Sequence, residues 1–282
     1  VNTSGGDAKQ ITSHSAYDYM PIWSNDSKKI AFSSNRHGNF DVFIVDKEGG
    51  VPTRLTYHSS NDYPYSFDNT DSKVYYQSSR LDDNKSMQFP SILLGEIYEV
   101  GINGGREHQF VSFCAEDLNF SKDGQFMIFH DKKGYEDPWR KHQTSSVARD
   151  IVLYDLKNKT FRTLTNFEGE DRDPQFIDNN SFYFLSEKSG SFNIWKGNLN
   201  GNAYEEQITS FKDHPIRFLS MANNGTLCFG YHGSIFTWSN GETKKIEVSI
   251  KKDAVKNDIT LLPIDGQASE FAVSPDGTEI VY

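Results

Sequence analysis

Imidazole and carboxylate side chains recur at equivalent positions along this sequence. Each position comes just after a threonine that closes one apolar run and just before the next run begins. His14 with Asp18 and His58 with Asp62 are the first two such pairs. Several carboxylates at one opening concentrate cations or basic peptide ends, and imidazoles beside carboxylates can hold a divalent ion. We expect these positions to surround the mouth of a channel. The candidate residues at this opening are His14, Asp18, His58, Asp62, Glu170, Asp171, Asp173, Asp213 and His214.

The same positions also have a structural interpretation. An aspartate before a strand can accept hydrogen bonds from backbone N–H groups of a turn, and a following proline fixes the entry into the strand. We favour this interpretation for Asp18, Asp62, Asp173 and Asp213. A metal held by the three histidines is the less favoured alternative, so the metal content of the opening stays undecided and no cofactor is expected.

A second candidate is the polar stretch that contains Trp139, Arg140, Lys141 and His142. It combines an aromatic ring with a basic cluster in a protein whose formal net charge is -10. Loops on a rigid scaffold are common places for binding residues. The stretch therefore either docks a partner domain or a peptide carboxylate, or is an ordered surface loop with no ligand.

Catalytic signatures are missing from the sequence. It has no Gly-x-Ser-x-Gly, Gly-x-Gly-x-x-Gly, phosphate-loop or His-Glu-x-x-His motif. Cys114 and Cys228, the two cysteines, both lie in apolar contexts typical of small buried hydrophobic residues. We therefore expect no catalytic residue in this chain.

The composition excludes several classes of protein. Among 282 residues, 21 are Phe and 14 are Tyr, and so many rings are kept in water only by burying them, which excludes disorder. Two cysteines exclude a disulfide scaffold, and the apolar runs are too short for a membrane helix. The negative charge disfavours nucleic acid as a partner.

The elements that must position the candidates are short strands in a repeated unit. The step from Thr12 to Thr56 is 44 residues, and the step from Thr165 to Thr209 is 44 again. Each unit holds four apolar or aromatic runs separated by turn residues, which is typical of antiparallel strands joined by hairpins. Four strands repeated at this period predict the blades of a β-propeller.

The unit count predicts an all-β, six-bladed propeller of four-stranded antiparallel blades in one domain, 1–282. Five units are complete, and the last blade is expected to be shared between the N-terminal and C-terminal segments. The predicted blades are about 13–56, 57–112, 113–165, 166–209, 210–250, and 251–282 plus 1–12.

The repeat resembles that of the TolB and tricorn protease families. The first unit carries the matching string, from Asp18 through Pro21, Trp23-Ser24 and Asp41 to Leu55-Thr56. A narrower likeness lies in the insertion 133–151, which is similar to the one in the N-terminal six-bladed propeller of tricorn-like bacterial peptidases.

The resemblance implies a non-catalytic propeller that gates or docks peptides, at the front of a longer polypeptide whose later domains include a serine peptidase. Its partners would be peptides or those downstream domains, and its location the periplasm, with the cytoplasm as the alternative. Two other interpretations stay open. One is a stand-alone TolB-like propeller that binds a protein of the bacterial envelope, and the less favoured one is a metal-dependent propeller lyase or glycosidase.

Overall fold

A computed structural model describes residues 1–80, 94–135, 137, 139–142, 144–251 and 270–281. Every regular element that runs through these residues is a β-strand. In this part of the chain, no helix is long and apolar enough to cross a membrane. The chain divides into two compact units, Val1–Ser249 and Ile250–Tyr282, and each is described by itself.

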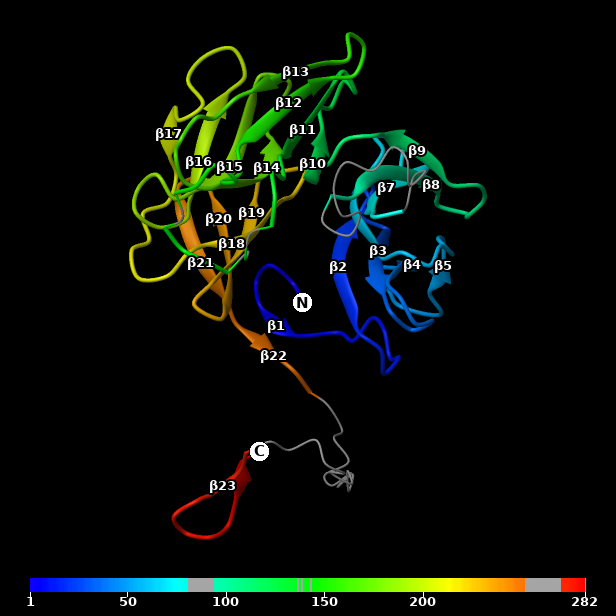
Figure 1. Cartoon of the computed structure of the whole chain (residues 1–282), viewed down its shortest axis with the longest axis vertical. Coiled ribbons are helices and arrows are strands. Elements are labelled where there is room, and N and C mark those ends of the chain that lie inside the picture. The colour runs from blue at the N-terminus through cyan, green and yellow to red at the C-terminus, as the bar shows by residue number, and fades with distance from the viewer. Residues whose placement is uncertain (81–93, 136, 138, 143, 252–269, 282) are drawn as a thin grey trace. The chain divides into compact units, whose positions relative to one another are not determined.

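The first unit contains five four-stranded antiparallel sheets, here called blades 1 to 5 (Figure 1). In each blade the strands are paired in the order in which they follow one another along the chain. Blade 1 consists of β2 (Asp18–Trp23), β3 (Lys29–Ser34), β4 (Asp41–Asp46) and β5 (Thr53–Arg54). Blade 2 consists of β6 (Asp62–Phe67), β7 (Lys73–Ser78), β8 (Glu96–Gly101) and β9 (His108–Val111). Blade 3 consists of β10 (Glu116–Phe120), β11 (Phe126–His130), β12 (Ile151–Asp155) and β13 (Thr160–Thr163). Blade 4 consists of β14 (Asp171–Phe176), β15 (Ser181–Ser186), β16 (Asn193–Asn198) and β17 (Glu206–Gln207). Blade 5 consists of β18 (Arg217–Met221), β19 (Leu227–Tyr231), β20 (Ser234–Ser239) and β21 (Glu242–Ile246).

The turn between the first and second strands is built from its own sequence. In blade 1 the hydroxyl of Ser24 donates to Asp26 at 2.8 Å and accepts the N–H of Lys29 at 2.9 Å. In blade 3 the hydroxyl of Ser121 accepts the N–H of Phe126 at 3.0 Å in the same way. These local bonds satisfy backbone groups in the turn, so the hairpin forms from residues a few positions apart.

The core lies between neighbouring blades. One buried cluster combines Ala31, Val42 and Ile44 of blade 1 with Phe67, Val74 and Tyr76 of blade 2, and three similar clusters follow between blades 2 and 3, 3 and 4, and 4 and 5. Each large side chain that is fully buried in this way contributes roughly 1.5–3 kcal/mol. A single blade has no way to bury both of its faces, so each blade depends on its neighbours.

The first strands of successive blades contact one another in chain order, from β2 through β6, β10 and β14 to β18. Each of them carries a register shift against its second strand. At four of these shifts a non-glycine residue has a positive φ: Met20 at 50°, Asp117 at 49°, Asp173 at 51° and Phe218 at 59°. Such bulges redirect side chains, and they occur often near functional sites.

The prediction of six blades is wrong, since the described residues form five four-stranded blades. Within the described residues, the N-terminal segment forms a strand pair through β1 (Gly6–Asp7), which lies parallel to β22 (Val248–Ser249), directly after blade 5. The sequence predicts that the N-terminal strand belongs to a blade shared with the C-terminal segment. In the structure this strand pairs with Val248–Ser249 instead. In the second unit, β23 (Ala272–Val273) and β24 (Ile280–Val281) form a hairpin of two strands. Residues 252–269, also assigned to the sixth blade, lie outside the described residues.

Hairpin tips link the blades of the first unit at one end. The side-chain amide of Asn223 in blade 5 donates to the carbonyl of Asn25 in blade 1 at 2.9 Å, across 198 positions of the sequence. Asn25 in turn donates its backbone N–H to Asp71 of blade 2 at 2.8 Å. The side chain of Asn69 in blade 2 then donates to Ser121 of blade 3 at 3.0 Å. These contacts hold blades 5, 1, 2 and 3 together at the turns that follow their first strands, which are called the inner strands below.

Candidate functional site

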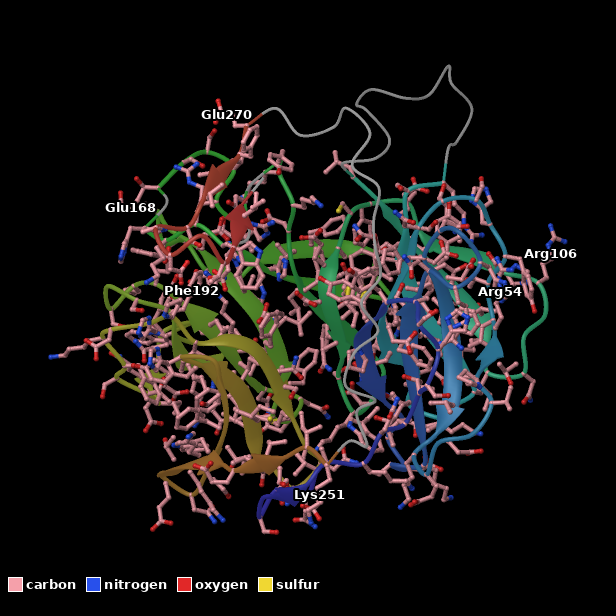
Figure 2. The ribbon with its side chains drawn as sticks, turned by 90° about the horizontal axis from the view of Figure 1, so that it is seen from below. Arg54, Arg106, Glu168, Phe192, Lys251 and Glu270 are labelled. Carbon is pink, nitrogen blue, oxygen red and sulfur yellow. The ribbon has the colours of Figure 1, made fainter. Side chains whose placement is uncertain are left out.

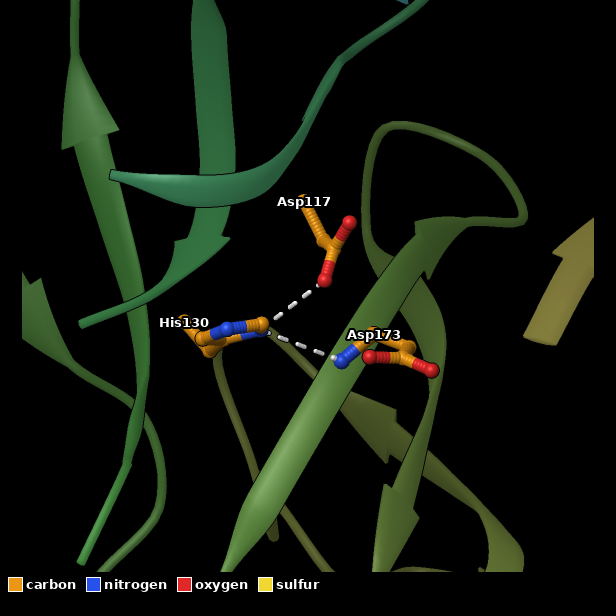
Figure 3. A group of neighbouring side chains, drawn as sticks. All are labelled: Asp117, His130 and Asp173. Carbon is orange, nitrogen blue, oxygen red and sulfur yellow. Dashed lines mark hydrogen bonds and ion pairs between the residues drawn. The ribbon is translucent and has the colours of Figure 1, made fainter. Parts of the chain in front are cut away.

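Two carboxylates and an imidazole meet where the first two strands of blade 3 face the first strand of blade 4 (Figure 3). Asp117 lies in the bulge of β10, His130 ends β11, and Asp173 lies in the bulge of β14. One ligand atom from each residue lies within 4.8 Å of the other two. Aspartate tolerates the left-handed backbone of both bulges, so the sequence supplies an acid where the chain needs this conformation.

His130 is held in place from behind. Its side chain is only 3% exposed, and Nε2 lies 3.3 Å from Oε2 of Glu116. Glu116 is bound in turn by Nζ of Lys132 at 2.8 Å, and Nε of Arg149 lies 3.6 Å away. Burial works against the charge on Glu116, but His130 and Lys132 outweigh it and hold the pKa of this carboxyl far below its ordinary range. Glu116 is therefore a fixed anion that orients the imidazole.

Nδ1 of His130 faces the two aspartates. It lies 3.7 Å from Oδ2 of Asp117, and it accepts the backbone N–H of Asp173 at 3.4 Å. Burial, and then the neighbouring carboxylate of Asp173, raise the pKa of Asp117 to about 7. Two like charges from adjacent blades thus share one small site.

A second charged network joins the same two blades through buried groups. Arg149 of blade 3 reaches both carboxylate oxygens of Glu170 at 3.3 Å, and Nε of Arg172 donates to the same carboxylate at 2.7 Å. Beside it, Asp171 accepts the hydroxyl of Tyr204 at 2.5 Å, and burial raises the pKa of this aspartate to about 7. The contact between Arg149 and Glu170 ties blade 3 to blade 4, and the other contacts hold Glu170 and Asp171 in place within blade 4.

The loop that carries Trp139 leaves blade 3 and is anchored on blades 4 and 5. Arg217 at the start of β18 donates to the carbonyl of Trp139 at 3.2 Å, and its guanidinium lies 4.9 Å from the centre of the indole ring. The indole also makes an edge contact with Phe218, with the ring centres 6.0 Å apart. On blade 4, Glu187 accepts the backbone N–H of His142 at 3.0 Å.

This anchored loop presents its candidate residues to solvent. Trp139 is 61% exposed, and Arg140, Lys141 and His142 are exposed as well. Phe218, which lies beside the indole, is 69% exposed. Residues 136, 138 and 143 of the same loop lie outside the described residues. The described part forms an aromatic and basic surface whose backbone is fixed at two points.

The predicted aspartates of the first two blades are engaged by arginines of their own blade. Arg36 lies 2.8 Å from Asp18, and Arg80 lies 3.1 Å from Asp62. Asp62 is completely buried, and burial raises its pKa to about 6. These two carboxylates are therefore parts of ion pairs inside blades 1 and 2.

The predicted histidines do not converge. Nδ1 of His14 accepts the N–H of Ala16 at 3.0 Å, and Nδ1 of His58 accepts the N–H of Ser60 at 3.0 Å. His214 stacks on His232, with ring centres 4.2 Å apart, and Asp213 is exposed. Within the described part of the chain, Asp173 is the one predicted candidate that belongs to a group able to hold a metal.

Sequence reasoning missed Asp117, His130 and Arg217. Asp117 and Arg217 lie in the first strands of blades 3 and 5, at positions that the repeat pattern does not single out. His130 ends the second strand of its blade, a position filled by serine in β3, β7 and β15. A register-by-register comparison of the units would have found all three.

The chain is similar to a known protein family and to several solved structures. A family model described as the tricorn protease N-terminal beta propeller domain matches residues 1–244. The crystal structure of the tricorn protease is similar to this chain with a TM-score of 0.69 at 21% identity, covering 84% of this chain and 23% of that one.

Two TolB structures are also similar. A putative TolB from Agrobacterium tumefaciens has a TM-score of 0.65 at 15% identity, covering 83% of this chain and 82% of that one. TolB from Acinetobacter baumannii has a TM-score of 0.60 at 16% identity, with coverages of 79% and 53%. At these identities the likeness establishes the fold. No curated protein matches the sequence.

Proposed function

Because the chain belongs to the family of tricorn protease N-terminal β-propeller domains, we propose that it is a non-catalytic module that docks peptides for a peptidase. In this proposal the peptidase domains belong to the same polypeptide, and the propeller acts as their gate. The chain corresponds to 23% of the length of the tricorn protease. The catalytic motifs that the sequence lacks would then lie in other domains.

The observation that carries the proposal is the anchored loop of blade 3. Its backbone is bound by Arg217 of blade 5 and Glu187 of blade 4, and its indole is exposed. A fixed aromatic ring with basic neighbours suits a peptide, because the ring supplies contact area at little cost in entropy and a cation can bind the terminal carboxylate. The surface has both features in Trp139 and Lys141.

Fluorescence anisotropy with labelled peptides of about ten residues tests this proposal. We expect the 282-residue chain to bind a peptide with a free C-terminal carboxylate more tightly than its C-terminal amide. Trp139→Ala should weaken binding about tenfold or more, as expected for an aromatic anchor. The matched control is Trp23→Ala, which removes an exposed tryptophan of blade 1 and should leave the affinity unchanged.

Equal affinities for the Trp139→Ala and Trp23→Ala variants would contradict docking at the loop.

Incubation with casein and with fluorogenic peptides tests the non-catalytic part of the proposal. Turnover that is lost on mutation of an inner-strand residue such as Asp173 would overturn it. The periplasmic location stays a prediction, which fractionation of cells that express the tagged protein would test.

A further inference from the structure

We propose that Asp117, His130 and Asp173 bind one divalent transition-metal ion of the Zn²⁺ or Mn²⁺ class, at a site separate from the docking loop. The three residues come from the first and second strands of blade 3 and from the first strand of blade 4, and their ligand atoms lie within 4.8 Å of one another. An ion at this position would bond blade 3 to blade 4.

The first argument is the direction of the imidazole (Figure 3). Nε2 of His130 lies 3.3 Å from the carboxylate of Glu116, so this nitrogen carries the proton that is donated to the anion. Nδ1 then presents its lone pair toward Oδ2 of Asp117 and the backbone N–H of Asp173. A histidine whose second nitrogen donates to a carboxylate is the usual arrangement of a metal ligand.

The second argument is the excess of acceptors. The lone pair of Nδ1 and two carboxylates face one another, and Nδ1 lies 3.7 Å from Oδ2 of Asp117. Among the described residues, the backbone N–H groups of Asp173 and Leu219 donate to Nδ1 of His130 and to Asp173, both at 3.4 Å. Both bonds are long. The charge of Arg217 also acts on Asp173, and a bound cation would add a positive charge between the two aspartates and the imidazole.

The third argument is the support behind the ligands. Glu116, which holds His130, is itself bound by Lys132 at 2.8 Å and lies 3.6 Å from Arg149. Such a shell fixes the orientation of a ligand before the ion arrives. One imidazole with two carboxylates suits Zn²⁺ or Mn²⁺ better than Ca²⁺ or Mg²⁺, which prefer oxygen ligands alone. Three protein ligands leave positions for water or a substrate group.

Isothermal titration of the chelator-treated 282-residue chain with ZnCl₂ and with MnCl₂ tests the site. We expect one equivalent of at least one of these ions to bind. Asp117→Asn and Asp173→Asn keep a residue that tolerates the left-handed backbone and should each lower the affinity at least about 100-fold. Glu116→Gln, which changes the support and not a ligand, should lower it about 10- to 100-fold.

Three control variants separate this site from surface binding and from the docking loop. His14→Gln and His58→Gln remove exposed histidines outside the cluster and should leave the affinity unchanged, as should Trp139→Ala in the docking loop. Circular dichroism checks that each variant folds, and if one aspartate variant does not fold, the other and the absorption spectrum of bound Co²⁺ remain as readouts. The absence of stoichiometric binding, or binding that both aspartate variants retain, would overturn the proposal.

Discussion

Blades 1 and 2 share the strand pattern of blades 3 and 4, but the two pairs of blades place their charges differently. In blades 1 and 2 each ion pair lies inside one blade, Arg36 with Asp18 and Arg80 with Asp62. Between blades 3 and 4 the charges cross the boundary, since Arg149 of one blade binds Glu170 of the other. Figure 2 shows the two sides, with Arg54 and Arg106 on the first and Phe192 and Glu168 on the second.

Aromatic rings also meet between blades 1 and 2. Tyr19 of β2 makes an edge contact with Tyr63 of β6, with ring centres 6.3 Å apart, and Phe40 packs against both. The comparison teaches that one backbone repeat supports two kinds of boundary. An ion pair within a blade stabilises that blade, whereas charges across a boundary bring unlike blades together and create a site where acceptors meet.

The largest expected effect separates the two kinds of ion pair. Arg149→Met removes a buried cation that binds Glu170, whose own side chain is 1% exposed. We expect the free energy of unfolding to fall by about 3 kcal/mol, because a buried carboxylate loses part of its compensation. Arg36→Met, in the more exposed pair of blade 1, should cost about 1 kcal/mol. Urea denaturation measures both, and equal losses would remove the distinction between the boundaries.

A pH series gives the next effect. Asp171, whose pKa burial raises from 3.8 to about 7, keeps its proton in the folded state at pH values where the unfolded chain has lost it. The free energy of unfolding therefore falls as the pH rises from 3.8 to about 7, and Asp171→Asn should flatten this fall.

Asp62→Asn is the matched variant in blade 2. The same fall should be flattened only between pH 3.8 and about 6, because the pKa of Asp62 is raised less. Denaturation curves recorded at several pH values decide between the two windows. An Asp171→Asn variant whose pH dependence equals that of the unmodified chain would contradict the prediction.

A double-mutant cycle sharpens the aromatic side of the comparison. Tyr19→Ala, Tyr63→Ala and the double variant should give a coupling free energy of about 1 kcal/mol, as for other edge-to-face pairs. The cycle isolates the ring pair because each single variant removes the same contact. A coupling near zero would mean that this ring pair does not help to hold blades 1 and 2 together.

The smallest expected effect concerns the loop of blade 3. Trp139→Leu removes the ring that lies over Arg217 and beside Phe218. We expect a loss of about 0.5 kcal/mol, because a cation–π contact at an exposed site is weak. Trp23→Leu in blade 1 is the control, and a larger loss there would show that the loop contributes nothing to the boundary between blades.

The sequence predicted the local features of the fold well. Four-stranded antiparallel blades are confirmed, and the resemblance to the tricorn propeller is confirmed by the family match over residues 1–244. The hairpin at Ser24 explains why, since its hydrogen bonds join residues at most five positions apart. The blade count was wrong, because the N-terminal strand pairs with Val248–Ser249, a contact that no local pattern encodes.

The sequence by itself determined which residues form strands and turns, because alternating burial and turn chemistry act over a few neighbouring positions. Only the tertiary structure decided which charged groups meet. Asp173 reaches His130 across 43 positions of the sequence, and Asp117 joins them through a bulge. The distances between these side chains depend on how blades 3 and 4 pack and on where each inner strand shifts its register. Packing and register depend on contacts between residues far apart in the sequence, so no single segment determines them.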